Sequence, residues 1–145
     1  MTNNQYINAY RKTQQSSNAV TTSYQIVRTL MKELVNSMHK IVLDIQDERK
    51  RKSDTFLVDK AFEEKNARNK SKNLSKSLSI IYGLQTSLDF DKASEIANNF
   101  FQLYEYCRHE IIKGFTKKIE NGILKAIDVV KQIMEGWEEI PSLEK

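Results

Sequence analysis

The scarcity of glycine and proline constrains the fold of this chain more than any other feature of its sequence. Only four glycines and one proline occur among 145 residues, about 3% where average usage is roughly 12%. β-Sandwiches and doubly wound α/β domains place many such residues in their turns. So few turn residues predict few turns, and therefore a small number of long helices. At this length we expect one domain with a sizeable core that needs no disulfide or metal.

Cysteine usage and the absence of long apolar runs indicate the class of protein. The one cysteine, Cys107, excludes an internal disulfide, and no Cys/His cluster has zinc-ligand spacing. The first residues show no basic stretch followed by an apolar one, as a secretory signal has. No segment approaches the ~18 apolar residues of a membrane span. We therefore expect a soluble, cytoplasmic protein without membrane insertion.

The positive charge is concentrated in one segment. The chain carries a net charge of +4, but ten basic and four acidic residues between Arg49 and Lys76 give this segment +6. The run Arg49–Lys52 is suited to phosphates or to an acidic partner, yet it has no interleaved aromatic residues for stacking on bases. Cations also suit the C-terminal end of a helix. The sequence favours a solvated helix end, and nucleic-acid binding remains the less favoured alternative.

Apolar residues recur every three to four positions in four segments, and this spacing predicts amphipathic helices. The first expected helix begins near 21–23 and runs through 45. The second ends at 88, and its start is left open within 56–74. The third spans 92–119, and the fourth runs from 123 to Pro141. Short connections make successive helices antiparallel neighbours. The predicted fold is an all-α, antiparallel four-helix bundle with a short N-terminal helical segment.

The predicted organisation has one bundle domain with less ordered ends. The bundle covers residues 23–140, and residues 141–145 form a tail. Residues 1–22 are expected to be a flexible N-terminal segment that contains a short helix. Within the bundle, 46–73 is expected to be either an extended basic connection or a helix overhang, because it offers almost nothing to bury.

The sequence offers little that could support catalysis. Glu105 and His109 stand four residues apart, a spacing typical of exposed helical pairs, and His39 belongs to no metal motif. All four glycines are isolated, so no phosphate-binding loop is present. Cys107 lies on the apolar stripe of the third helix and is predicted to be buried rather than nucleophilic. We expect no enzymatic activity, no metal and no cofactor.

Aromatic residues cluster in the third predicted helix. Phe100, Phe101, Tyr104 and Tyr106 lie within seven residues and cover more than the stripe of about 100° that one core requires. They are interpreted either as aromatic margins of the core, with tyrosine hydroxyls reaching water, or as a groove for a partner helix. The sequence leaves both interpretations open.

Several short motifs resemble a known family. Residues 83–89 read Gly-Leu-Gln-Thr-Ser-Leu-Asp, and residues 96–106 read Ile-Ala-Asn-Asn-Phe-Phe-Gln-Leu-Tyr-Glu-Tyr. In this order they are similar to the motifs Leu-x-x-Ser-Leu-Asp and Ile-Ala-x-Asn-Leu-x-x-Leu-Tyr-x-Tyr of the flagellin-specific secretion chaperones, the FliS family. Residues 6–11 resemble the opening Tyr-x-x-Tyr-Lys of the family, and Trp137 matches a Trp near the end of its last helix.

The resemblance implies a function. Members of this family are cytosolic four-helix bundles that capture the C-terminal segment of flagellin, which is disordered in solution. They prevent premature polymerisation and deliver flagellin to the flagellar type III export apparatus. We accordingly expect flagellin as partner, with the export gate and a co-chaperone as further partners, and a monomer when free. A chaperone or adaptor for another flagellar or type III client is the alternative.

The resemblance also suggests site residues. The client-binding groove is predicted from the first helix and the later helices, with ordinary core packing as the alternative for each residue: Leu30, Leu34, Leu88, Phe101 and Tyr104. Tyr6, Ile7 and Tyr10 are predicted to occupy this groove when no client is bound. The segment 46–73 is longer and more basic than the usual connection of the family, which suggests an extra surface for a partner.

Overall fold

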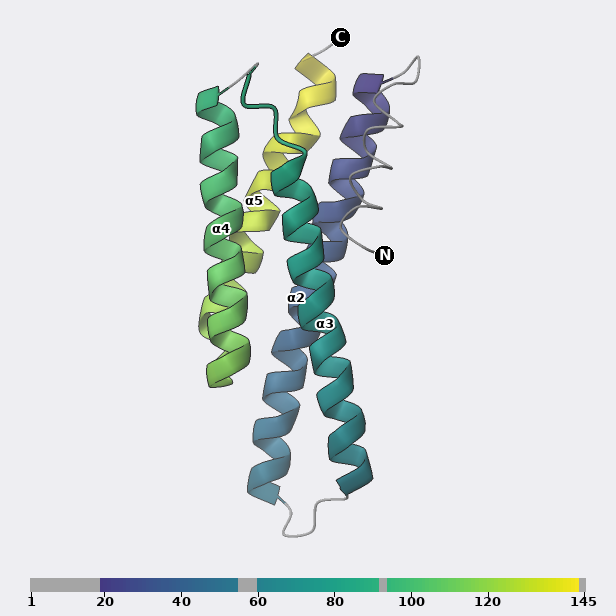
Figure 1. Ribbon diagram of the computed structural model, residues 1–145, viewed down its shortest axis with the longest axis vertical. Coiled ribbons are helices and arrows are strands. Elements are labelled where there is room, and N and C mark those ends of the chain that lie inside the picture. Colours follow the sequence, from purple (N-terminus) through teal and green to yellow (C-terminus); the bar gives the residue numbers. More distant parts are fainter. Residues whose placement is uncertain (1–18, 55–59, 92–93, 144–145) are drawn as a thin grey trace.

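The computed structural model describes residues 19–54, 60–91 and 94–143, and these residues form four helices (Figure 1). The helices are α2 (Ala19–Asp54), α3 (Lys60–Thr86), α4 (Ser94–Lys117) and α5 (Asn121–Leu143). No strand occurs in the part of the chain that the structure describes. The predicted all-α four-helix bundle is confirmed, while the predicted N-terminal helical segment lies outside the described residues.

The helices form a closed bundle in which each packs against two neighbours. Contacts join α2 to α3, α3 to α4, α4 to α5 and α5 back to α2, and α2 also meets α4 across the centre. Successive helices run in opposite directions (Figure 1). Short connections favour this up-down-up-down arrangement because each helix can cover the apolar stripe of the helix before it.

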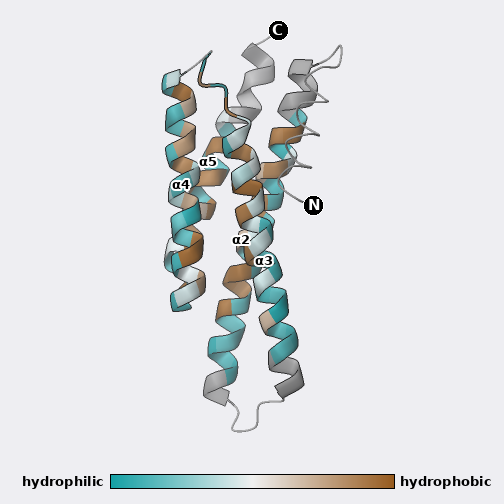
Figure 2. Cartoon of the chain, viewed as in Figure 1, coloured by the Kyte–Doolittle hydropathy of each residue, from teal (hydrophilic) through white to brown (hydrophobic). Residues whose placement is uncertain are grey.

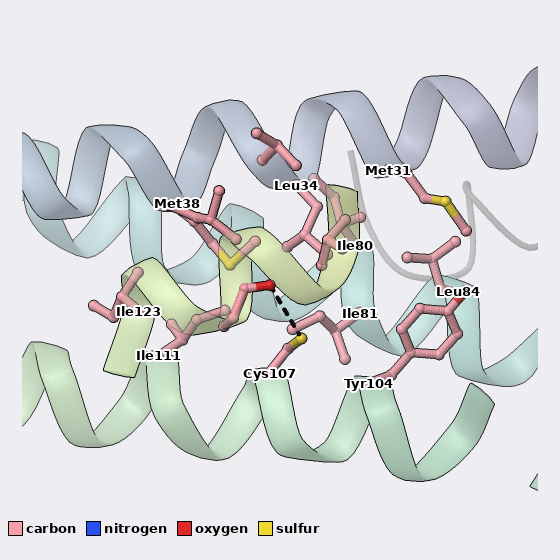
Figure 3. Close-up of a cluster of buried hydrophobic side chains, with 14 of the residues drawn as sticks. Met31, Leu34, Met38, Ile80, Ile81, Leu84, Tyr104, Cys107, Ile111 and Ile123 are labelled. Atoms are coloured by element: carbon pink, nitrogen blue, oxygen red, sulfur yellow. Dashed lines mark hydrogen bonds between the residues drawn. The ribbon is translucent and has the colours of Figure 1, made fainter. Parts of the chain in front are cut away.

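The core is a single cluster of aliphatic and sulfur-containing side chains contributed by all four helices (Figure 3). Its members recur at helical spacing, so that each stripe faces the bundle axis. The largest fully buried side chains are Met31, Leu34, Met38, Ile41, Ile80, Ile81, Leu84, Cys107, Ile111, Ile123, Ile127 and Val130.

The connection between α4 and α5 depends on a close approach of backbones. Lys118 adopts a left-handed conformation with φ of 58°, and the amide of Ile119 donates to the carbonyl of Gly114 at 3.1 Å. This pattern is a common way of ending a helix. A Cβ atom on Gly114 would lie 2.6 Å from Ile123 Cδ1 and 2.7 Å from Ile119 O. Glycine is therefore required there for α5 to pack against the end of α4.

The helix ends differ slightly from the predicted ones. α2 includes Ala19, before the expected start at 21–23, and α4 is described from Ser94 on, while the expected start at Lys92 lies outside the described residues. Pro141 was expected to end the last helix, but α5 continues to Leu143. Proline has helix-compatible φ and lacks one backbone donor, so near a helix end it removes little hydrogen bonding.

α2 and α3 extend past α4 and α5 at one end of the molecule (Figure 1). Arg49 of α2 binds Glu120 in the α4–α5 connection, so the residues of α2 that follow Arg49 lie beyond that connection. We call residues 49–54 of α2 and 60–69 of α3 the overhang. Its coloured residues are mostly hydrophilic (Figure 2), and Ile45 is the last buried hydrophobic residue before it. The described part of 46–73 is therefore helix with little to bury.

Candidate functional site

The structure divides the five residues of the predicted groove between the core and its margin. Leu30, Leu34 and Tyr104 are 7%, 0% and 3% exposed, so they are core residues and form no open surface. Leu88 and Phe101 are half-buried at the edge of the bundle. The predicted plug residues Tyr6, Ile7 and Tyr10 lie outside the described residues. Of the five predicted residues, Leu88 and Phe101 are thus the ones that are partly accessible to solvent.

Large apolar side chains that are accessible to solvent gather around the first half of α4 and the residues that precede it. Ile96, Phe100 and Leu103 follow the same helical stripe as the fully buried Cys107, yet Ile96 is 59% exposed and Leu103 37%. Phe90 is 44% exposed, and its ring meets that of Phe101 edge-on, with 6.2 Å between centroids. We call Phe90, Ile96, Phe100, Phe101 and Leu103 the α4 apolar surface. Figure 2 shows hydrophobic segments in this part of α4.

This surface is energetically significant. Fully burying one large aliphatic or aromatic side chain stabilises a complex by about 1.5–3 kcal/mol. Large exposed apolar side chains that gather in one part of a protein can mark a site of interaction. Phe100 stacks against the buried Tyr104, with 6.3 Å between ring centroids, so the surface rests directly on the core. It can therefore receive an apolar partner without reorganising the bundle.

A buried glutamine ties α3 to α4 beside this surface. Gln85, only 9% exposed, donates from Nε2 to the carbonyl of Phe101 at 3.4 Å and to Glu105 Oε1 at 2.9 Å. Glu105 also accepts two bonds from Arg108, both at 3.0 Å. Arg108, and after it Gln85, lower the pKa of Glu105. Sequence reasoning missed Gln85, although a polar residue on the apolar stripe of α3 was the available signal.

The titratable groups beneath the surface are neutral. Burial raises the pKa of the Tyr104 hydroxyl and raises the pKa of the Cys107 thiol to about 12. Cys107 is buried, and its Sγ contacts the carbonyl of Ala126 at 3.8 Å (Figure 3). A buried protonated thiol behaves as a small hydrophobic side chain. Its predicted burial is confirmed.

The described part of the chain has neither a metal site nor a membrane-spanning helix. Among the described residues, no group of three or more His, Cys, Asp or Glu side chains is placed to hold a metal ion. Within the same ranges, no helix combines the length and the hydropathy that crossing a bilayer requires.

Comparisons with known proteins give two matches. The family model described as "Flagellar protein FliS" matches residues 6–144 of this chain. The flagellar secretion chaperone FliS of Salmonella typhimurium (strain LT2) is 32% identical over 72 residues, which are 49% of this chain and 53% of that protein. The chain thus spans about half the length of the curated relative that it matches. No solved structure matches significantly.

Proposed function

Because this chain belongs to the FliS family of flagellar proteins, we propose that it is a flagellar secretion chaperone whose client is flagellin. It binds the disordered C-terminal segment of flagellin in the cytoplasm, prevents premature polymerisation and delivers the subunit to the flagellar type III export apparatus. The observation that carries this proposal is the family match over residues 6–144. The α4 apolar surface supports it by offering a place for such a segment.

The client segment folds as it binds. A segment that forms a filament core must expose an apolar face once it becomes helical, and the α4 apolar surface covers that face in the complex. Ordering the segment costs about 2–5 kcal/mol, which the burial of two or three large side chains offsets. The remaining affinity is moderate, so the client can be released at the export apparatus.

The predicted groove residues take different parts in this binding. Phe101 and Leu88 lie at the margin of the bundle and contact the client directly. Leu30, Leu34 and Tyr104 belong to the core and support the surface from within. Tyr6, Ile7 and Tyr10 are proposed to cover the surface in the absence of client.

Titration with peptides tests the proposal. A synthetic peptide of the flagellin C-terminus is added to the full chain, and the fluorescence of Trp137, the single tryptophan, and the heat of binding are recorded. We expect saturable binding that changes little with salt. The C-terminal peptides of hook-cap and rod subunits serve as comparison. Binding of these instead of flagellin would favour the alternative client, and binding of an added oligonucleotide that weakens steeply with salt would favour nucleic-acid binding.

A matched pair of substitutions tests the surface itself. Ile96→Glu places a charge on the α4 apolar surface, while Leu43→Glu places one on α2, where Leu43 is 57% exposed, nearly as much as Ile96 at 59%. Losing the burial of one isoleucine should weaken flagellin-peptide binding by roughly 10- to 150-fold. Leu43→Glu should change it less than about twofold. Equal effects of the two substitutions would refute the placement of the site.

Deletion of residues 1–12 tests the plug. The truncated chain should keep its helical circular dichroism, bind more of an apolar fluorescent dye and bind the flagellin peptide more tightly. Dye binding and peptide affinity that both equal those of the full chain would show that Tyr6, Ile7 and Tyr10 do not cover the surface.

A further inference from the structure

A second surface lies at the opposite end of α4 from the α4 apolar surface. A pocket of about 490 Å³ opens where the last turn of α4 meets α2 and α3. Its floor is formed by the buried Ile41 and Ile45 together with Phe115, and Ala67 of α3 forms one wall. We call it the overhang pocket, because the overhang extends from its outer edge (Figure 1). At this end of the bundle, the pocket thus leads from the solvent to residues of the core.

Ion pairs hold the walls of this pocket in place. Glu48 of α2 accepts a hydrogen bond from Lys70 Nζ of α3 at 2.5 Å and a second from Lys118 Nζ. Next to it, Arg49 donates two bonds to the carboxylate of Glu120, at 3.0 and 2.6 Å. These pairs join α2, α3 and the α4–α5 connection. Glu48, Lys70 and Lys118 all line the pocket, so their ion pairs form part of its wall.

The charge around the pocket favours an acidic occupant. Arg51, Lys70 and Lys118 line it, against Asp44 and Glu48. Lys70 and Lys118 already bind Glu48, and the excess of positive charge lies in the described residues 49–54 and 60–76, which carry ten basic and three acidic residues, a net +7. A partner with several carboxylates is therefore attracted to this end of the molecule.

The shape of the pocket favours a helix over a small anion. Its lining on α2 runs from Ile41 to Arg51, which at 1.5 Å per residue is about 15 Å, or three helical turns. The facing wall on α3 runs from Asn66 to Ser71. Phe115 and Lys118 flank the pocket as far as Glu48, to which Lys118 binds. Beyond Glu48, α2 and α3 continue where α4 has ended (Figure 1). An added helix would take up the course of α4 there and extend the bundle.

We propose that the overhang pocket is the docking site for an acidic amphipathic helix of a partner protein. The apolar side chains of this helix fill the pocket above Ile45 and Phe115, and its carboxylates face the basic walls. The site is separate from the α4 apolar surface, so that client and partner can be bound at the same time. This inference goes beyond the proposed function and does not depend on it.

A peptide selection tests the proposal. A display library of random 16-residue peptides is selected for binding to the full chain, to Ala67→Trp, in which an indole fills the pocket, and to Asn69→Trp. Asn69 is an exposed residue of the same helix that does not line the pocket, so its substitution is the matched control. Circular dichroism establishes that all three proteins are equally helical.

The expected result is a set of peptides that the full chain and Asn69→Trp retain but Ala67→Trp binds at least tenfold more weakly. These peptides should be rich in Asp and Glu, with apolar residues at i, i+3 or i+4, and i+7. A set without acidic excess, or one that Ala67→Trp retains, would overturn the proposal. So would dimerisation of the full chain that Ala67→Trp abolishes, since the occupant would then be a second copy. The flagellin peptide should bind Ala67→Trp as tightly as it binds the full chain. A failure of this proposal can therefore be distinguished from a failure of the proposed function.

Discussion

Tyr104 places a polar atom inside an apolar core. Its side chain is 3% exposed, and among the described residues no hydrogen-bond partner of its hydroxyl is present. Leaving a buried hydroxyl unpaired costs about 1–3 kcal/mol. We expect Tyr104→Phe to raise the free energy of unfolding by about 1 kcal/mol, as measured by urea denaturation.

The matched variant Tyr104→Ala removes the ring as well. It should lower the free energy of unfolding by about 3–5 kcal/mol, as other truncations of buried aromatic residues do. A loss of stability of 1 kcal/mol or more in Tyr104→Phe would contradict the prediction and assign the hydroxyl a partner outside the described residues.

Lys118 combines an unfavourable backbone conformation with an ion pair to Glu48. Lys118→Ala and Lys118→Gly both remove the ion pair, but only glycine adopts positive φ without steric cost. We therefore expect Lys118→Gly to be about 1 kcal/mol more stable than Lys118→Ala in urea denaturation. Equal stabilities of the two variants would show that the left-handed conformation costs nothing here.

Glu48 makes the stability of the bundle depend on pH. Burial acts to raise the pKa of this carboxyl, but hydrogen bonds from Lys118 and Lys70 outweigh it and lower the pKa from 4.5 to about 2. The folded state thus binds fewer protons than the unfolded state between these values, so the stability contributed by Glu48 is present above pH 4.5 and lost as the pH falls towards 2.

Urea denaturation between pH 2 and 6 measures this dependence. In Glu48→Gln, the free energy of unfolding should fall less over this window than in the unsubstituted chain. In Glu135→Gln, at an exposed glutamate of α5, it should fall as much. Identical profiles for Glu48→Gln and the unsubstituted chain would contradict the role of this carboxyl.

At the scale of the helices, the overhang and the core differ in what protects their backbone hydrogen bonds. The part of α3 from Ile80 to Leu84 packs in the core, whereas the side chains at 64, 65 and 67–69 are exposed. Local opening requires little free energy where few apolar contacts are broken. Hydrogen exchange should therefore be at least about 100-fold faster in 64–69 than in 80–84, as measured by mass spectrometry of peptides. Comparable rates would indicate that a contact protects the overhang.

The four helices were predictable because the 3.6-residue spacing of apolar side chains is a local property of the sequence. Whether a given apolar residue is buried depends on which neighbouring helix covers it at that level. Ile96 and Cys107 share one stripe of α4, yet one is 59% exposed and the other 0%. For this reason the spacing could not separate Phe101, which is half-buried at the margin, from the buried Leu34 and Tyr104. Gln85 was missed because its partners lie on another helix.

At the scale of the whole molecule, α4 connects two different surfaces. Phe100 belongs to the α4 apolar surface and Phe115 to the overhang pocket, and their separation of fifteen residues corresponds to about 22 Å along the helix. The flagellin peptide and a selected acidic peptide should therefore bind together. In a titration of the chain saturated with one peptide, we expect the affinity for the other to change less than about threefold. Mutual exclusion would show that the two peptides share one surface.

Because α2 and α3 are longer than α4 and α5, the length of the molecule can change without a change in the stability of its core. The overhang side chains that the structure describes, at 49–51 and 64–69, are not part of the buried core, so α2 and α3 can be lengthened or shortened there by matched insertions or deletions of seven residues in each helix. Such steps keep the two helices in register and leave the bundle unchanged. This end of α2 and α3 is in this sense a spacer of adjustable length, whose size can follow the geometry of the assembly that the protein meets.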